Sequence, residues 1–185
     1  DYGFRYELGL ILSGYRNEVK KLASNQFISN TYTRTEVGHP ISSFYGYVID
    51  GIFQTQGEVD SHVEQSDKAI GRWKYRDVNN DGKIDSQDRA YIGNPHPDFE
   101  YSLSSRFYYK NFDLSLYIQG SQGNDICFAS KGGRDGLDFW GDYFNKSTRI
   151  LNTWTPENRN AELPEINILN PNDEAGKVSS YLIED

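Results

Sequence analysis

The sequence predicts an all-β protein built from antiparallel strands. Two of its segments alternate apolar and polar residues with a period of two, which is typical of strands that have one apolar side. Aromatic residues make up 15% of the 185 residues, with 14 Tyr and 10 Phe, and there are 17 Gly. Rings and glycines at these frequencies favour β-structure over a helical bundle.

The first alternating segment spans residues 4–19. Its odd positions include Arg5, Glu7 and Ser13, whereas its even positions are almost all apolar. A helix is the alternative, because Leu8 and Leu12 also fall on helical spacing. Two glycines and the rings at the start of the segment disfavour a helix, so we predict one long strand. Its apolar side consists of Phe4, Tyr6, Leu8, Leu10 and Leu12.

Residues 77–88, DVNNDGKIDSQD, match the spacing of a calcium loop. Such a loop takes oxygen ligands from its positions 1, 3, 5, 7, 9 and 12 and has Gly at position 6, which here is Gly82. Calcium is a hard cation that prefers oxygen ligands, and Ile84 is expected to point inward as an apolar anchor. The expected ligands are Asp77, Asn79, Asp81, the main-chain carbonyl of Lys83, Asp85 and Asp88.

Two features of this loop indicate a structural ion rather than a switch. Asp88 occupies the position where calcium sensors have Glu, and the flanking segments are not amphipathic helices. The alternative is a turn rich in Asp and Asn that binds no ion, because these residues form local turns readily.

Residues 99–120 predict a β-hairpin. Two alternating arms, about 9 to 11 residues each, are joined by Lys110-Asn111, and Asn111 tolerates the positive φ that a tight turn needs. Leu103 and Leu114 are expected on the same outward face. The apolar side consists of Phe99, Tyr101, Leu103, Phe107 and Tyr109 in the first arm and Phe112, Leu114, Leu116 and Ile118 in the second.

The alternation alone leaves two fold classes open. A soluble sandwich would bury the apolar side, but its strands are usually about five or six residues long. Arms of about 9 to 11 residues match strands that cross a bilayer, and Phe107, Tyr109 and Phe112 gather near the turn as an interfacial girdle would. Polar stretches at 22–43, 54–70 and 121–176 predict long loops, and short turns opposite long loops are typical of outer-membrane barrels.

Composition excludes several function classes. The formal net charge of −8 with scattered Lys and Arg argues against nucleic acid as a partner. The single cysteine, Cys127, excludes an internal disulfide and is expected to be a small apolar filler. His39, His62 and His96 share no zinc-ligand spacing, and no nucleophile with an activating base is evident, so we do not expect an enzyme. The chain has no Met, so we expect it to be a mature product or a piece of a longer protein.

Four segments in order resemble the C-terminal part of SusC/RagA-family TonB-linked outer-membrane proteins. They are SSFYGYVIDGIFQTQGEV (42–59), KYRDVNNDGKIDSQDRAYIGNPHPDF (74–99), YKNFDLSLYIQGSQGNDI (109–126) and WTPENRNAELP (154–164). The resemblance covers nearly all of the chain. It implies that residues 1–185 are a C-terminal part of a TonB-dependent receptor β-barrel, namely strands of an incomplete transmembrane barrel with long extracellular loops.

The same resemblance implies a function and partners for the parent protein. Members of that family have 22-stranded barrels that hold a plug, and they import oligosaccharides or peptides across the outer membrane with a SusD-like surface lipoprotein as lid. TonB would be contacted through a part outside this chain, and outer-membrane lipid would surround the strands. The turn at 110–111 would face the periplasm, and the calcium loop 77–88 would be extracellular.

Two alternatives remain at this point. The first is a soluble, secreted calcium-binding β-domain that binds glycan or protein. The second concerns five aromatic residues of the loop regions, which either stack on sugar rings or pack the loops together, and packing is the favoured interpretation. These residues are Tyr45, Tyr47, Phe53, Trp73 and Trp140.

Overall fold

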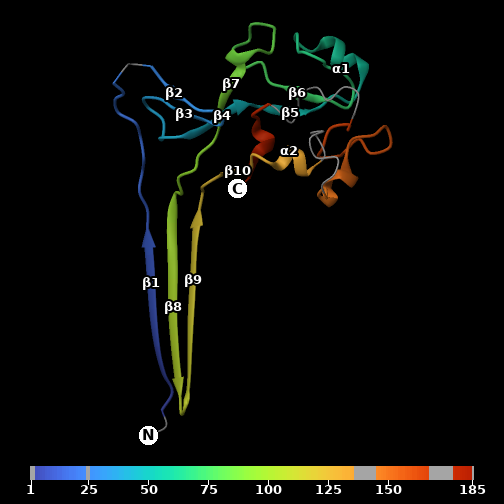
Figure 1. The fold of residues 1–185 in the computed structure, drawn as a ribbon. Coiled ribbons are helices and arrows are strands. Elements are labelled where there is room, and N and C mark those ends of the chain that lie inside the picture. The colour runs from blue at the N-terminus through green and yellow to red at the C-terminus, as the bar shows by residue number, and fades with distance from the viewer. Residues whose placement is uncertain (1–2, 24–25, 136–144, 167–176, 185) are drawn as a thin grey trace.

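The computed structural model describes residues 3–23, 26–135, 145–166 and 177–184. Within these ranges the protein is all-β, as predicted: every sheet is antiparallel, and the helical elements are short turns. Figure 1 shows two parts, a sheet of three long strands and, at one end of it, a head of short strands and turns. No helix in the described ranges is long and apolar enough to cross a membrane.

The long sheet consists of β1 (Arg5–Ser13), β8 (Phe99–Tyr109) and β9 (Phe112–Gln122) in the order β1-β8-β9. Both alternating segments therefore form strands, but the first is shorter than predicted: the strand expected over 4–19 spans only Arg5–Ser13. β1 ends at Ser13, and farther along the chain Val19 bonds to a loop of the head: its amide donates to the carbonyl of His39 at 2.9 Å. The sheet is consistent with part of a barrel wall, but three strands do not close a barrel.

The predicted hairpin is confirmed, and its turn is Lys110-Asn111. Tyr109 pairs with Phe112, which leaves two loop residues between the strands. The positive φ lies at Lys110 (52°) rather than at Asn111, where the sequence predicted it. A turn whose first central residue has positive φ matches the right-handed twist of the flanking strands, so the position in the turn outweighs the residue's own preference.

The register places all the predicted apolar residues on one face of the sheet. Leu10 pairs with Leu103, and Leu103 pairs with Ile118, so these three side chains form one rung across the strands. Phe107 pairs with Leu114, which confirms that Leu103 and Leu114 share a face. The opposite face is mostly polar, with Ile11, Tyr108 and Tyr117 interspersed among its polar residues.

The head contains strands that the sequence analysis assigned to loops or did not resolve. One sheet has the order β2-β3-β4-β7, and a second pairs β5 with β6. Short helical turns connect them, and β10 pairs with β11 near the C-terminus. The bounds are β2 Ile28–Ser29, β3 Thr33–Thr35, β4 Ser43–Tyr47, β5 Ile49–Ile52, α1 Gln56–Ser61, β6 Trp73–Tyr75, η1 Ser86–Asp88, β7 Arg89–Gly93, β10 Ile126–Cys127, α2 Lys131–Arg134, η3 Thr148–Asn152, η4 Ser180–Leu182 and β11 Ile183–Glu184.

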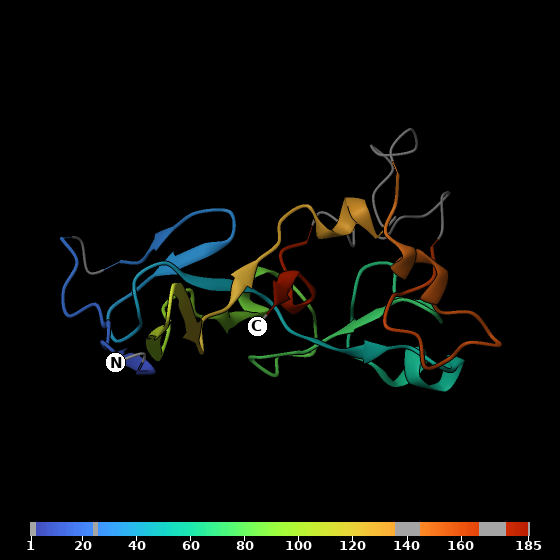
Figure 2. The ribbon, with the colours of Figure 1, turned by 90° about the horizontal axis from the view of Figure 1, so that it is seen from below.

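The hydrophobic core lies in the head and not in the long sheet. In the part of the chain that the structure describes, the buried hydrophobic residues are Phe53, Val59, Trp73, Tyr75, Trp154, Leu163 and Leu182. Figure 2, which views the molecule from the turn end, shows the head extending well beyond the footprint of the three long strands. The head therefore has a core of its own, whereas no segment in the described part of the chain covers the apolar face of the long sheet.

The C-terminal segment closes this core. The amide of Tyr47 donates to the carbonyl of Val178 at 2.8 Å, and the ring of Tyr181 packs against Trp73 at 4.7 Å between centroids. Gly46 permits this approach, because a Cβ at that position would lie 2.4 Å from the Val178 carbonyl oxygen. The last described residues thus belong to the same packed unit as β4 and β6.

Candidate functional site: the acidic loop and the two faces of the long sheet

The acidic loop 77–88 connects β6 to β7 in the head. Figure 1 places this connection at the end of the molecule opposite the Lys110-Asn111 turn. The separation of loop and turn agrees with the sequence prediction that they lie at opposite ends of the strands.

Backbone amides hold the side-chain oxygens in the first half of the loop. Asp77 accepts hydrogen bonds from the amides of Asp81 (3.2 Å) and Gly82 (2.9 Å), one on each carboxylate oxygen. Asn79 accepts from the Asp81 amide at 3.0 Å, and Asp81 accepts from the Lys83 amide at 3.1 Å. Gly82 has φ 89°, a conformation that suits glycine and lets the loop turn sharply.

Asp88 joins the two ends of the loop. Its side chain is 0% exposed, and its two oxygens accept from the amides of Val78 (2.9 Å) and Asp85 (2.7 Å). Asp85 in turn caps the 3₁₀ turn η1 by accepting from the Gln87 amide at 2.8 Å. Because a buried carboxylate without partners is costly, these bonds show that Asp88 organises the loop from inside.

Ile84 anchors the loop to the core, as the sequence predicted. Its side chain packs against Trp73 and Tyr75, and its amide donates to the Glu64 carbonyl at 2.7 Å. Lys83 lies on the outer side, with Nζ 2.8 Å from the Asp85 carboxylate. The bond from Lys83, followed by the bond from the Gln87 amide, lowers the pKa of Asp85 below its ordinary value.

The described residues do not form a ready-made metal centre. Across these ranges, no group of three or more His, Cys, Asp or Glu side chains is arranged to hold a metal ion. The donor chemistry of the six predicted ligand positions suits a hard cation, but the carboxylates are turned toward backbone amides. Calcium binding by Asp77, Asn79, Asp81, Lys83, Asp85 and Asp88 therefore stays a prediction.

The apolar face of the long sheet is open to its surroundings. Leu8, Leu10 and Leu12 are 65–72% exposed, and Leu114, Leu116 and Ile118 are 49–54% exposed. The exposed aliphatic side chains lie on the two outer strands, β1 and β9, and Leu103 on the middle strand β8 is half-buried between them. An apolar patch of this extent is one that soluble monomers rarely present. The face needs a cover of apolar character.

Aromatic residues flank the aliphatic band at both ends. Tyr6, Phe107, Tyr109 and Phe112 lie at the turn end, and Phe99 and Tyr101 lie at the head end. Phe99 and Tyr109 are ten residues apart on β8, which is about 34 Å along a strand and about 26 Å of membrane thickness at a tilt of about 40°. That spacing matches the apolar band of about 25 Å between two aromatic girdles in outer-membrane barrels.

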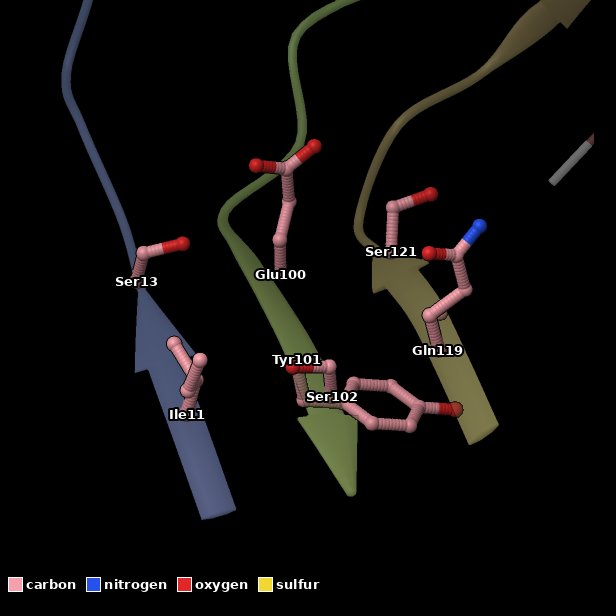
Figure 3. A pocket seen from close by; sticks show the side chains of 8 residues that line it. Ile11, Ser13, Glu100, Tyr101, Ser102, Gln119 and Ser121 are labelled. Atoms are coloured by element: carbon pink, nitrogen blue, oxygen red, sulfur yellow. The ribbon is translucent and has the colours of Figure 1, made fainter. Parts of the chain in front are cut away.

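The polar face contains a hollow of about 430 Å³ near the head. Figure 3 shows Glu100 over the central strand, Ser13 on one side and Gln119 and Ser121 on the other. The register places these side chains in two rungs, and they come from all three long strands. The rungs are Ser13–Glu100–Ser121 and Ile11–Ser102–Gln119.

The aromatic residues singled out for sugar stacking pack against the protein instead. Phe53 is 0% exposed and Trp73 is 2% exposed. Tyr47 lies 5.6 Å from Tyr75 between ring centroids, and Tyr45 packs edge-on to Tyr91 at 5.3 Å. The favoured packing interpretation holds for these four, and Trp140 lies outside the described residues.

Two polar residues have structural roles that the sequence analysis did not find. Gln65 is buried and bonds to the backbone of β6 at both ends: its amide nitrogen donates to the Trp73 carbonyl at 2.8 Å, and its oxygen accepts from the Tyr75 amide at 3.0 Å. Asp125 accepts from the Asn94 amide at 2.6 Å and so ties the exit of β9 to the entrance of β8. Gln65 lies outside the four segments that carry the resemblance, and Asp125 lies inside the segment 109–126 without any pattern that indicates this bond.

Comparison with known proteins places the chain in a wider context. No family model matches it. It is 30% identical over 174 residues to TonB-dependent receptor P26 of Formosa agariphila, an alignment that covers 87% of this chain and 17% of that protein. This chain is homologous to a segment of TonB-dependent receptors. It is also 30% identical over 143 residues to TonB-dependent receptor P3 of the same organism, covering 77% of this chain and 14% of that one.

The chain thus spans less than a fifth of the length of the TonB-dependent receptors that it matches. The two matches support a relationship with TonB-dependent receptors over most of this chain. It also agrees with the resemblance to a TonB-linked outer-membrane protein that the sequence motifs indicated.

Proposed function

We propose that this chain is a part of the barrel wall and extracellular loops of a TonB-dependent outer-membrane transporter. The observation that supports this most is the apolar face of β1, β8 and β9, which is exposed and has an aromatic row at each end. In such a barrel, lipid covers that face, the polar face lines the lumen, and the head lies outside the cell. The parent protein is a transporter and not an enzyme.

The finer proposal is a SusC/RagA-type importer of large nutrients, most favourably glycans. Its basis is the four ordered sequence segments, and in this proposal a SusD-like surface lipoprotein contacts the head as a lid. TonB acts on a part of the protein outside this chain. The hairpin does not contact the lid lipoprotein in this proposal, because the exposed apolar face of the hairpin contacts lipid.

In this proposal the acidic loop carries a structural calcium ion. The residues that would hold it are Asp77, Asn79, Asp81, the Lys83 carbonyl, Asp85 and Asp88. When bound, the ion supplies positive charge to a loop with four carboxylates and one nearby ammonium group. The chain's own contribution is the frame of amide donors and the Ile84 anchor, which order the loop in advance and lower the cost of docking a lid or substrate.

A soluble, secreted calcium-binding β-domain is the second candidate. The separate core in the head favours it, since the head packs without help from the long sheet. Its difficulty is the long sheet itself, whose apolar face would need a protein cover.

Fractionation of cells that express the full-length protein separates the two candidates. The transporter proposal expects the protein in the outer membrane, uptake of an oligosaccharide that stops when TonB is absent, and co-purification of a surface lipoprotein. Deleting residues 77–88 should weaken lid association or uptake and leave the barrel folded. A secreted protein that stays soluble without detergent would contradict the transporter proposal, and unchanged uptake and lid association in the deletion would contradict the role of the loop.

A further inference from the structure

The hollow on the polar face is built from two complete rungs of the long sheet. One rung has Ser13, Glu100 and Ser121, and the next one toward the turn has Ile11, Ser102 and Gln119. Adjacent strands lie about 4.8 Å apart, and rungs on the same face lie about 6.8 Å apart along each strand. The five polar side chains therefore border a small area of the sheet and line the same hollow (Figure 3).

Some side chains nearer the turn on the same face already bond within the sheet. There, Arg5 pairs with Glu7 and lies over the Tyr108 ring at 5.0 Å, and Ser104 donates to the Gly9 carbonyl at 3.4 Å. In the hollow, the side chains of the five polar residues make no hydrogen bond or ion pair with any described residue. Among the described residues, all five polar side chains of the hollow are thus free to bond a ligand, as are Asp113 and Ser115 nearer the turn, which lie outside the hollow.

We propose that this hollow is a binding subsite for a neutral, polyhydroxylated ligand, namely one or two units of an oligosaccharide. Three hydroxyls, one amide and one carboxylate offer both donors and acceptors, which is what neighbouring sugar hydroxyls require. The charge of Glu100 disfavours an anionic ligand, and no Lys or Arg lines the hollow. The nearest basic residue along β8 on this face is Arg106, beyond the Ser104 rung.

The subsite rests on the proposed function, because the hollow faces the lumen only if the opposite face meets lipid. In the lumen, the hollow would contact the substrate as the substrate passes along the barrel wall. Several hydrogen bonds of moderate strength would hold the substrate there. Such bonds replace bonds to water and so contribute specificity more than tight binding. A polypeptide segment on the same hollow is the competing occupant, and the experiment separates it from a sugar.

The test uses the full-length receptor in detergent, with binding measured by calorimetry. The probes are maltohexaose, cellohexaose, laminarihexaose and xylohexaose, with a Gly-Ser hexapeptide as the polypeptide probe. The double variant Ser102→Ala/Gln119→Leu removes two hydrogen-bonding groups from the hollow. Ser115→Ala is the matched control, because it lies on the same face of β9 but outside the hollow.

We expect the wild-type receptor to bind at least one of the four sugars. The double variant should bind that sugar about ten- to a hundredfold more weakly, and Ser115→Ala should stay within about twofold of wild type. No sugar binding to wild type, an unchanged affinity in the double variant, or binding of the hexapeptide alone would overturn the subsite. None of these results tests whether Leu116, on the apolar face, contacts lipid. The subsite can therefore fail while the proposed function is still supported by its own experiments.

Discussion

Tyr101 lies directly opposite Gly120 in the β8–β9 pair, and its hydroxyl oxygen is 2.5 Å from the place that a Cβ on residue 120 would take. The glycine therefore lets the ring of the head-end aromatic row lie flat across β9. Gly120→Val should displace the ring and destabilise the hairpin by about 1–3 kcal/mol, because overpacking forces side chains away from preferred rotamers. Urea unfolding of the full-length receptor in detergent measures this.

The control for that prediction is Gly3→Val, since a Cβ at Gly3 would have nothing within 4 Å. Adding Tyr101→Ala to Gly120→Val removes the clashing ring and should recover part of the loss. A double variant that is less stable than Gly120→Val alone would contradict the contact.

A charge on the apolar face should be costly at mid-band. Leu116 pairs with Ser105, midway along β8 and β9, and is 49% exposed. Leu116→Lys should destabilise the barrel by about 2–4 kcal/mol, because the lysine would face hydrocarbon. Ser115→Lys, one residue away on the polar face, should cost about 0–1 kcal/mol if that face is wet. If the two variants lose the same free energy of unfolding, the two faces do not differ in their contact with lipid, and the proposal is contradicted.

The buried carboxylate of Asp88 should matter more for loop order than any exposed one. Asp88→Asn replaces one acceptor oxygen with an NH₂ group that meets a backbone amide, either that of Val78 or that of Asp85. Leaving a buried donor unpaired costs about 1–3 kcal/mol, so amide hydrogen exchange across 77–88 should speed up clearly. Asp81→Asn keeps its acceptor oxygen at an exposed site and should leave exchange nearly unchanged.

Calcium removal tests the ion independently of the fold. If the loop binds calcium, calorimetry should show one site, and chelation should speed amide exchange in the 77–88 segment. Asp81→Ala should weaken binding more than Asn79→Ala, because it removes a charge as well as an oxygen. Ser86→Ala, which removes none of the six expected ligands, should not change the affinity. A calorimetric titration without heat at millimolar calcium would rule the ion out.

Glu36 gives the head a defined pH dependence. The hydrogen bond from the Tyr91 hydroxyl (2.8 Å), together with Arg34 at 3.0 Å, lowers the pKa of Glu36 below its ordinary value of 4.5. Because the folded pKa is lower than the unfolded one, the stabilisation is complete above that ordinary value and is lost as the pH falls through the folded pKa. Tyr91→Phe should raise the pKa of Glu36, which an NMR titration of its side-chain carboxyl carbon would show.

The long strands could be predicted from the sequence because period-two alternation continues over nine to eleven residues in each of them. Such a pattern fixes which side chains share a face, and Leu103 and Leu114 do. The Ile84 anchor was predictable for a similar reason, since one apolar residue stands within a polar loop motif. The position of the positive φ was not, because it depends on the turn geometry around Lys110 rather than on the preference of Asn111.

The head could not be predicted to the same degree. β2, β3 and β6 are two or three residues long, which is too short for any periodicity. Their pairing depends on contacts between distant segments, such as Gln65 with the backbone of β6 and Val178 with Tyr47. In the acidic loop, the ligand-like spacing was visible in the sequence, but the burial of Asp88 and its two amide bonds were not.

The central claim is that the face carrying Leu10 and Leu116 meets lipid and that the opposite face meets water. Spin labels on single cysteines in the full-length receptor, reconstituted in liposomes after every native cysteine, Cys127 included, is replaced by Ser, measure this directly. We predict high access to oxygen and low access to a nickel chelate at residues 10 and 116. At residues 11 and 115, on the polar face, we predict the reverse. Equal access of the nickel chelate to both faces would contradict the account.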